Sequence, residues 1–192
     1  GQESIGPSAQ ATPVDKDEFK NTGGIFGAEL DLAANATVYL DSYFQEADVD
    51  YDKSFGPDGR HRTKNQASTI GARTQLTDQL DLDVSYSQSL NARQEKPASL
   101  NDVSELQRDI ARAELKATLN DNHVLITGLE FEDEAYKASS ANLDVESEHK
   151  SAFVQHEIDY GKHDLVLGLR VIDHDNFNSH TTGNACLLYT SD

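Results

Sequence analysis

Two stretches of this chain are near copies of each other, and each begins just after a tight turn. Residues 123–130 read HVLITGLE and residues 163–170 read HDLVLGLR, so both follow the pattern His-x-Leu-x-x-Gly-Leu-charged. On one face, residues alternate as Leu125, Thr127 and Leu129 in the first copy and as three leucines in the second. A period of two predicts β-strands with one face in an apolar medium. The repetition predicts the same hairpin built twice, side by side.

Turn-forming residues recur along the whole chain, at 33–35, 77–79, 120–122 and 160–162. Asn, Asp and Gly favour tight hairpin turns, and here they return roughly every forty residues. Longer polar connections are predicted near 52–62, 92–105 and 137–147. The chain therefore alternates strand, short turn, strand and long loop, which predicts an all-β, antiparallel, up-and-down meander. The predicted strands are 24–33, 36–50, 63–76, 80–91, 107–119, 123–135, 148–159 and 163–173, with a ninth from about 181.

The predicted strands are longer than those of soluble sheets. Strands of about ten to fifteen residues exceed the usual five or six, whereas tilted strands that cross a bilayer need about nine to eleven. We therefore expect part of a transmembrane β-barrel, incomplete and open, because eight or nine strands of a larger barrel leave two unpaired edges. The residues expected to face lipid are Leu80, Leu82, Val84, Leu125, Leu129, Leu165, Leu167 and Leu169.

Composition fits this class and excludes others. The formal net charge of the 192 residues is -18, so the basic stripe of a nucleic-acid-binding protein is not expected. A mean hydropathy of -0.63 is compatible with a barrel, in which only alternate residues face lipid. No run of residues is apolar enough for a transmembrane helix, and no nucleophile elbow, phosphate loop or dinucleotide fingerprint is present, so an enzyme is not expected.

We divide the chain into three parts. Residues 1–23 are expected to be an outer loop or part of a preceding segment, and 24–185 to be barrel hairpins. Residues 186–192 read CLLYTSD, which is what a transposon-end sequencing adapter encodes when it is read through in frame. The alternative is that this segment is the apolar end of the ninth strand. Because residue 1 is not Met, the true start of the protein is expected upstream.

The hairpins resemble those of TonB-dependent outer-membrane receptors. The residues that carry the resemblance are 128–134, 151–157 and 165–170. The segment 173–185 is similar to a loop and strand start in receptors of the cobalamin-transporter type, with Phe177-Asn178 where relatives commonly have Phe-Gly, and 15–19 resembles an acidic loop of that group.

The resemblance implies a receptor in the bacterial outer membrane that takes up a scarce nutrient actively. Its partners would be outer-membrane lipid, a small-molecule ligand and a TonB-type energy coupler that acts through a plug domain outside this sequence. A corrinoid is the first expected ligand and a ferric siderophore the second. The alternatives are a passive porin-like barrel and a soluble β-rich binding module, against which the long strands argue.

Acidic residues in alternation form the main candidate site. Asp48, Asp50 and Asp52 would lie on one face of a strand, where three like charges repel unless they are solvated or bind a cation. Oxygen ligands suit Ca²⁺, and the resemblance implies calcium in acidic outer loops, so Asp15 and Asp17 (with Glu18) are candidates to complete the site. The alternative is a solvated acidic face.

Histidines and aromatic residues give weaker predictions. His174 and His180 flank a loop and are expected to have an ordinary outer-loop role rather than to bind metal. His123 and His163, which follow tight turns, are expected at the membrane interface. Aromatic girdles are typical of outer-membrane barrels, although this chain has no Trp, and ordinary sheet packing is the alternative. The girdle candidates are Tyr39, Tyr43, Phe44, Tyr51, Tyr86, Phe131, Tyr136, Phe153 and Tyr160.

Overall fold

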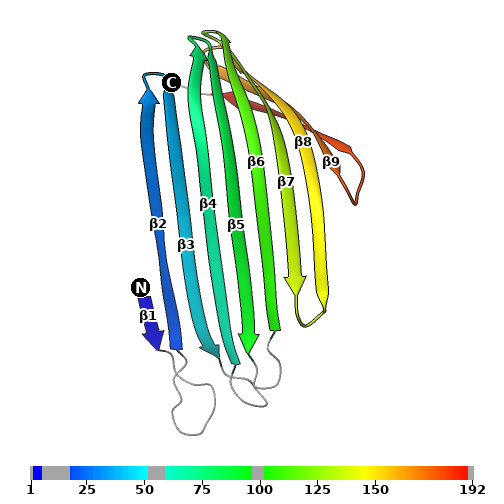
Figure 1. Ribbon diagram of the computed structural model, residues 1–192. Helices are drawn as coiled ribbons and strands as arrows, with labels where there is room; N and C mark the ends of the chain where they lie inside the picture. Colours follow the sequence, from blue (N-terminus) through cyan, green and yellow to red (C-terminus); the bar gives the residue numbers. More distant parts are fainter. Residues whose placement is uncertain (1, 6–17, 52–58, 97–101, 190–192) are drawn as a thin grey trace.

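The computed structural model describes residues 2–5, 18–51, 59–96 and 102–189. These residues form one ten-stranded antiparallel sheet in which neighbours in sequence are neighbours in the sheet (Figure 1). The strands are β1 (Gln2–Ile5), β2 (Glu18–Ala33), β3 (Ala36–Tyr51), β4 (Gly59–Thr77), β5 (Leu80–Lys96), β6 (Asp102–Asn120), β7 (His123–Ala138), β8 (Leu143–Asp159), β9 (His163–His174) and β10 (His180–Tyr189).

All four predicted short turns are present, and they lie together at the upper end of the sheet in Figure 1. Two residues separate β2 from β3, β4 from β5 and β6 from β7, and Gly161 between β8 and β9 has a φ of 73°. Such left-handed backbone costs glycine little. At the other end, Asn178 between β9 and β10 has a φ of 63°. Asn is among the few other residues that tolerate this region. Asn178 therefore adopts the kind of backbone conformation that would suit the Gly commonly found at this position in the receptors that the segment resembles.

Most strands extend further than predicted at the end opposite the short turns. β4 begins at Gly59 instead of residue 63, β5 ends at Lys96 instead of 91, and β8 begins at Leu143 instead of 148. Within residues 1–23, which were expected to be an outer loop or part of a preceding segment, 2–5 and 18–23 are strand. The extensions of β4 and β5, residues 59–62 and 92–96, carry polar residues on both faces and therefore lack the apolar alternation that marks a strand in sequence.

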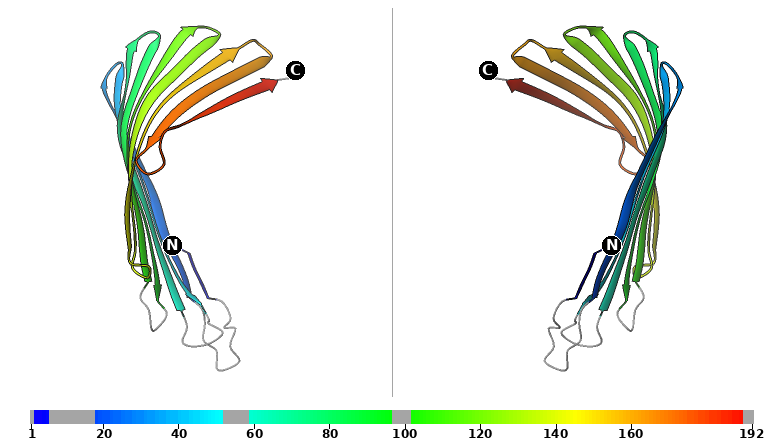
Figure 2. Two further views of the ribbon diagram at one scale, coloured as in Figure 1. Left: turned by 90° about the vertical axis from the view of Figure 1, so that its right-hand side faces the viewer. Right: turned by 90° about the vertical axis from the view of Figure 1, so that its left-hand side faces the viewer.

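The sheet is curved and open (Figure 2), as predicted. β1 and β10 are its two edges, and within the described residues they do not pair with each other. No described segment is a helix of the length and apolarity that crossing a membrane requires.

Residues 186–189 pair with β9 as the end of β10, and Leu187 lies opposite Leu165. Their origin in an adapter stays a prediction.

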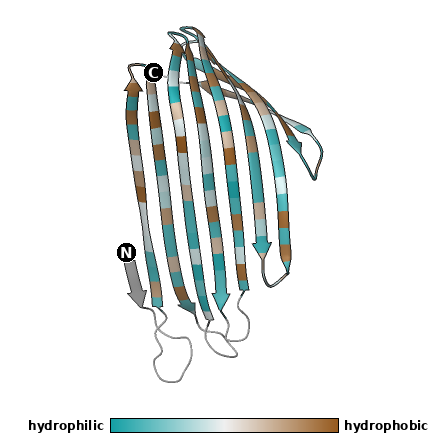
Figure 3. Cartoon of the chain, in the orientation of Figure 1, coloured by the Kyte–Doolittle hydropathy of each residue, from teal (hydrophilic) through white to brown (hydrophobic). Residues whose placement is uncertain are grey.

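The sheet is a single layer without an ordinary hydrophobic core. Among the described residues, only Tyr39 and Ala138 are buried hydrophobic residues, whereas Leu30, Ile70 and Leu129 are 64%, 53% and 54% exposed. Apolar surface on this scale requires an apolar partner. Figure 3 shows how hydrophobic and hydrophilic residues alternate along the strands.

The strand register assigns every paired residue to one of two faces, because directly opposed residues in antiparallel strands project to the same side. The first, here called the apolar face, includes all eight residues predicted to face lipid: Leu82 is opposite Leu115, Leu125 opposite Ala117, and Leu129 opposite Ala113. The apolar residues of this face lie toward the short turns. On β3 they run from Ala36 to Phe44, about the nine residues that a tilted strand needs to cross a bilayer. The second, the polar face, carries many charged and hydroxyl side chains.

Aromatic side chains divide between the two faces. Phe44 and Phe131 lie on the apolar face where it gives way to acidic residues on β3 and β7, and Tyr86 lies on the same face and donates a hydrogen bond to Asp109 on β6 at 2.6 Å. These positions are the ones expected of a girdle. The girdle prediction is wrong for five aromatic residues, because the register places them on the polar face, where they pack along the sheet. Those residues are Tyr39, Tyr43, Tyr51, Tyr136 and Phe153.

Rings also gather at the short-turn end of the apolar face, where His123 and His163 were expected at a membrane interface. The His123 ring lies 5.2 Å from that of His156 and 6.3 Å from that of Tyr160, and the His163 ring lies 5.1 Å from that of Tyr189. This is the end where a second interfacial girdle would lie.

Candidate functional site

The predicted acidic row lies at the end of β3 that is opposite the short turns, beyond the apolar stretch. This end of the sheet is here called the outer end. Asp48 and Asp50 are on one face, as predicted, and that face is the continuation of the apolar face. Arg62 is directly opposite Asp48 and Arg60 opposite Asp50. Of the other four candidate ligands, Asp52, Asp15 and Asp17 lie outside the described residues, and Glu18 begins β2 and forms an ion pair with Lys20 at 2.5 Å.

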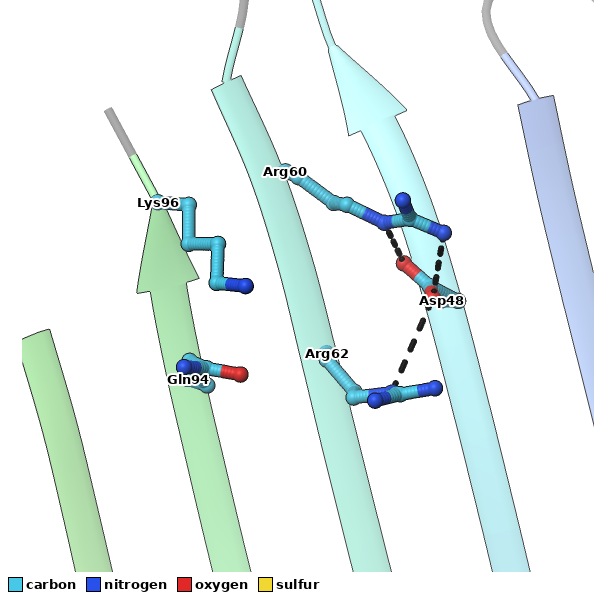
Figure 4. Close-up of a pocket in the computed structure, with 5 residues that line it drawn as sticks. All are labelled: Asp48, Arg60, Arg62, Gln94 and Lys96. Atoms are coloured by element: carbon cyan, nitrogen blue, oxygen red, sulfur yellow. Dashed lines mark hydrogen bonds and ion pairs between the residues drawn. The ribbon is translucent and has the colours of Figure 1, made fainter. Parts of the chain in front are cut away.

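Arginines on β4 neutralise this row. Arg60 donates two hydrogen bonds to the two carboxylate oxygens of Asp48, at 2.6 Å and 2.7 Å (Figure 4), and its Nε lies 3.7 Å from Asp50. Arg62 lies 2.9 Å from Glu46 and 3.7 Å from Asp48. The hydrogen bonds from Arg60 lower the pKa of Asp48, because they favour its charged form. The repulsion that motivated the calcium prediction is therefore relieved by the protein's own cations.

A first polar network lies on the polar face of β2 to β5. The Tyr39 hydroxyl donates to Asp83 at 2.9 Å, and Arg73 donates to Asp83 at 3.1 Å and to Glu29 at 3.3 Å. The Arg73 guanidinium also stacks on the Tyr39 ring, 4.3 Å from its centroid. These side chains connect four strands across the polar face.

A second network joins β6 to β9. Arg170 forms an ion pair with Glu130 and donates to Ser151 at 2.7 Å, and Arg112 donates to Glu114 at 2.5 Å. Both arginines lie over the Phe153 ring. The guanidinium carbon of Arg112 is 5.2 Å from the ring centroid and that of Arg170 is 5.9 Å from it. Within the described part of the chain, Arg170 Nε is the one buried side-chain nitrogen or oxygen without a hydrogen-bond partner. This network borders a polar pocket that Thr182 and Asn184 also line.

Histidines meet at the outer end of the polar face, but not in the pair considered from sequence. The register places His174 opposite His149, and their ring centroids are 4.1 Å apart. The Ser147 hydroxyl lies 2.9 Å from Nε2 of His149 and 3.3 Å from Nε2 of His174. His180 is opposite Ile172 instead. The described residues contain no group of three or more His, Cys, Asp or Glu arranged to hold a metal ion.

Sequence reasoning missed both polar-face networks, although a pattern for them exists. Glu130, Glu132 and Glu134 alternate along β7, and Arg108 and Arg112 are an even number of residues apart on β6. Because side chains two residues apart in a strand point to the same face, this spacing predicts a row of glutamates on β7 and a row of arginines on β6. Which arginine meets which glutamate depends on register, which the sequence pattern does not give.

An open antiparallel sheet with one lipid-compatible face and one polar, ion-paired face defines the wall of a transmembrane β-barrel. The sequence matches the family described as TonB dependent receptor-like, beta-barrel, over residues 4–192, and the chain belongs to this family. No curated protein sequence is similar enough to count as a relative.

Solved structures share the fold at low sequence identity. A mutant of the ferric enterobactin receptor from Pseudomonas aeruginosa has a TM-score of 0.75 at 12% identity, over 95% of this chain and 32% of that one. The outer membrane transporter YddB from Escherichia coli has a TM-score of 0.73 at 10% identity, over 93% and 30%. The alcaligin receptor from Bordetella pertussis has 0.70 at 17%, over 92% and 34%. The chain thus spans about a third of the length of these proteins.

Proposed function

We propose that this chain is part of a bacterial outer-membrane receptor that takes up a scarce nutrient by TonB-dependent active transport. The observation that carries the proposal is the two-faced single-layer sheet, whose apolar face is suited to lipid and whose polar face is suited to line a lumen. Membership in the receptor barrel family supports it. Arg73, Arg112 and Arg170 would then project into the lumen, where a plug or a ligand passes.

Two ligand classes are candidates. A ferric siderophore is supported by the named ligands of structural neighbours, which include ferric enterobactin and alcaligin receptors. A corrinoid is supported by the resemblance of segment 173–185 to receptors of the cobalamin-transporter type. The fold is common to both classes, so the ligand has to be identified by transport.

The test is uptake by a bacterial strain that lacks its own receptors and expresses the full-length protein. Labelled ferric siderophores and labelled cobalamin are supplied separately, in cells with and without TonB. We expect saturable uptake of one ligand class, lost when TonB is removed. Uptake that continues without TonB would identify a passive porin-like barrel instead.

A lumen variant tests the assignment of the polar face. Arg170→Gln should reduce uptake, because it removes the ion pair with Glu130 and the guanidinium beside the polar pocket. Lys150→Gln, on the opposite face of neighbouring β8, is the matched control, since the one ion pair of Lys150 among the described residues is with Glu148, at 3.7 Å. Equal uptake by the two variants at equal surface expression would contradict the lumen assignment.

A further inference from the structure

Two histidines lie directly opposite each other on the polar face, where β9 reaches its outer end. The register pairs His149 of β8 with His174, the last residue of β9. The Asp175 amide N–H donates to the Glu148 carbonyl oxygen at 3.2 Å, and these two residues flank the pair. A backbone bond between the flanking residues leaves the histidines in a non-hydrogen-bonded pair, in which the side chains of antiparallel strands lie closest.

The two imidazole rings direct nitrogen atoms at one point. Their centroids are 4.1 Å apart, and the rings are inclined by 38°. The Ser147 hydroxyl oxygen lies 2.9 Å from Nε2 of His149 and 3.3 Å from Nε2 of His174. A cation that takes the place of this hydroxyl would therefore meet two nitrogen ligands at once. Metal–nitrogen bonds of about 2.0–2.1 Å need each ring to move by about 1 Å toward that point, which side-chain rotation allows.

Asp175 supports one of the two imidazoles. Its carboxylate oxygen lies 3.0 Å from Nδ1 of His174, and the Asn176 amide nitrogen lies 3.0 Å from the same atom. The amide N–H favours the tautomer in which Nδ1 is bare, whereas the carboxylate favours the one in which Nδ1 carries the proton. A metal on Nε2 requires the second tautomer. A carboxylate on the other ring nitrogen is the usual support of a metal-binding histidine, and Asp175 supplies it.

The charges around the pair favour a cation. Glu132 of β7 is directly opposite His149, and it forms an ion pair with Arg108 at 2.8 Å. The same guanidinium is shared with Glu134, at 2.7 Å. With Asp175, three carboxylates and one guanidinium thus lie around the histidines. This excess of negative charge raises the local concentration of cations.

Both histidines are half-buried and accessible from the polar face. The Phe177 ring stands edge-on to the His174 ring, with the centroids 4.6 Å apart, and covers one side of the site. On the other face of the sheet Phe131 is opposite Lys150, the residue next to His149, so the histidines lie level with the outer limit of the apolar stretch. Two protein ligands leave the remaining coordination positions of a metal open to water or to other donors.

A second pair of histidines, His123 and His156, lacks this arrangement. Nδ1 of His123 lies 3.1 Å from Nε2 of His156, so these nitrogens face each other instead of a common third atom. The two residues are diagonal neighbours, because His123 is opposite Ile158 and His156 is opposite Leu125. Convergence on one point is therefore a property of the pair on the polar face.

We propose that His149 and His174 form a two-histidine site for a divalent transition-metal ion, which binds Cu²⁺ more tightly than Zn²⁺. Imidazole nitrogen is a preferred ligand of both ions, whereas Ca²⁺ and Mg²⁺ select oxygen. Opposed histidines act as a chelate, because binding to the first nitrogen holds the ion beside the second. The inference is independent of the proposed function, since it needs only the pairing of β8 with β9 and not the transport of a ligand.

The experiment titrates the purified full-length receptor, in detergent, with Cu²⁺ and counts the binding sites by calorimetry. Cu²⁺ is the probe because it binds most tightly in its series and because its electron paramagnetic resonance spectrum reports nitrogen ligands. The number of sites should fall by one in His149→Gln/His174→Gln. Either single substitution should weaken that site by about a hundredfold or more, because the chelate is lost.

His61→Gln/His180→Gln is the matched control. It removes two histidines from the same face, and in the described register neither of them lies opposite another histidine. The control should keep every copper site of the unmodified receptor. An unchanged number of sites in His149→Gln/His174→Gln, or the same loss in the control, would overturn the inference.

Measurements on the unmodified receptor test the site even if the glutamine variants do not fold. With one equivalent of Cu²⁺, the spectrum should show two imidazole nitrogens bound to copper. An excess of Zn²⁺ should displace the copper, and Ca²⁺ should not, because calcium selects oxygen ligands. A spectrum of oxygen ligands alone, or displacement by Ca²⁺, would contradict a two-histidine site.

Discussion

The Tyr39 ring on β3 lies across the backbone of Gly71 on β4, so closely that a β-carbon at position 71 would overlap ring atoms. Tyr39 is only 7% exposed, the lowest value but one among the described hydrophobic residues. Its hydroxyl reaches over Gly71 to Asp83 on β5. Glycine in a strand often marks such a close approach, and here it allows one tyrosine to connect three strands.

Replacing Gly71 with alanine should therefore destabilise the receptor. The new methyl group must displace the Tyr39 ring and weaken its hydrogen bond to Asp83, and overpacking of this kind costs typically about 1–3 kcal/mol. Unfolding in lipid by urea measures the change. Gly183→Ala is the control, because a β-carbon there would lie 3.4 Å from the nearest atom, the Gly168 carbonyl oxygen. Equal costs at both positions would argue against the packing described.

Adjacent residues of β9 test the two faces. Leu167→Arg places a charge in the apolar face and should cost roughly 2–4 kcal/mol near the bilayer midplane. Val166→Arg makes the same kind of change one residue earlier, on the polar face, directly opposite Glu157. It should cost much less, because the new guanidinium has a carboxylate beside it. The measurement is the free energy of unfolding of each variant in lipid. Similar losses for Leu167→Arg and Val166→Arg would contradict the assignment of the faces.

The pair of Asp48 and Arg60 should make stability depend on pH in a defined direction. Because the pKa of Asp48 is lower in the folded protein, its contribution is complete above the ordinary aspartate pKa of about 3.9 and is lost as pH falls through the folded value. The difference in unfolding free energy between the unmodified receptor and Asp48→Asn should therefore shrink on acidification. A difference independent of pH would show that the ion pair contributes nothing.

Calcium binding by the acidic row stays a prediction, and the structure sharpens its test. Arg60 occupies both carboxylate oxygens of Asp48, so it competes with any cation at Asp48 and Asp50. Arg60→Gln should then bind calcium more tightly than the unmodified receptor in calorimetry. If neither protein shows calcium heat, the row is a surface neutralised by arginine and solvent.

The alternation of residues along the sequence determined the strands and the lipid-compatible face. Leu80, Leu82 and Val84 on β5, and Leu165, Leu167 and Leu169 on β9, repeat with a period of two between recognisable turns, and that local pattern is enough to place them on one side. The short turns followed from Asn, Asp and Gly for the same reason, since turn propensity is local.

Tertiary structure alone decided the outer strand ends and the partners of the charged residues. Residues 59–62 and 92–96 are polar on both faces, so their strand conformation depends on pairing with each other and with neighbouring strands rather than on a local pattern. Likewise, Asp48 was predicted beside other acids but lies opposite Arg62 and binds Arg60. Cross-strand neighbours are set by register, which involves residues distant in sequence, and they decide whether a charge is paired or available.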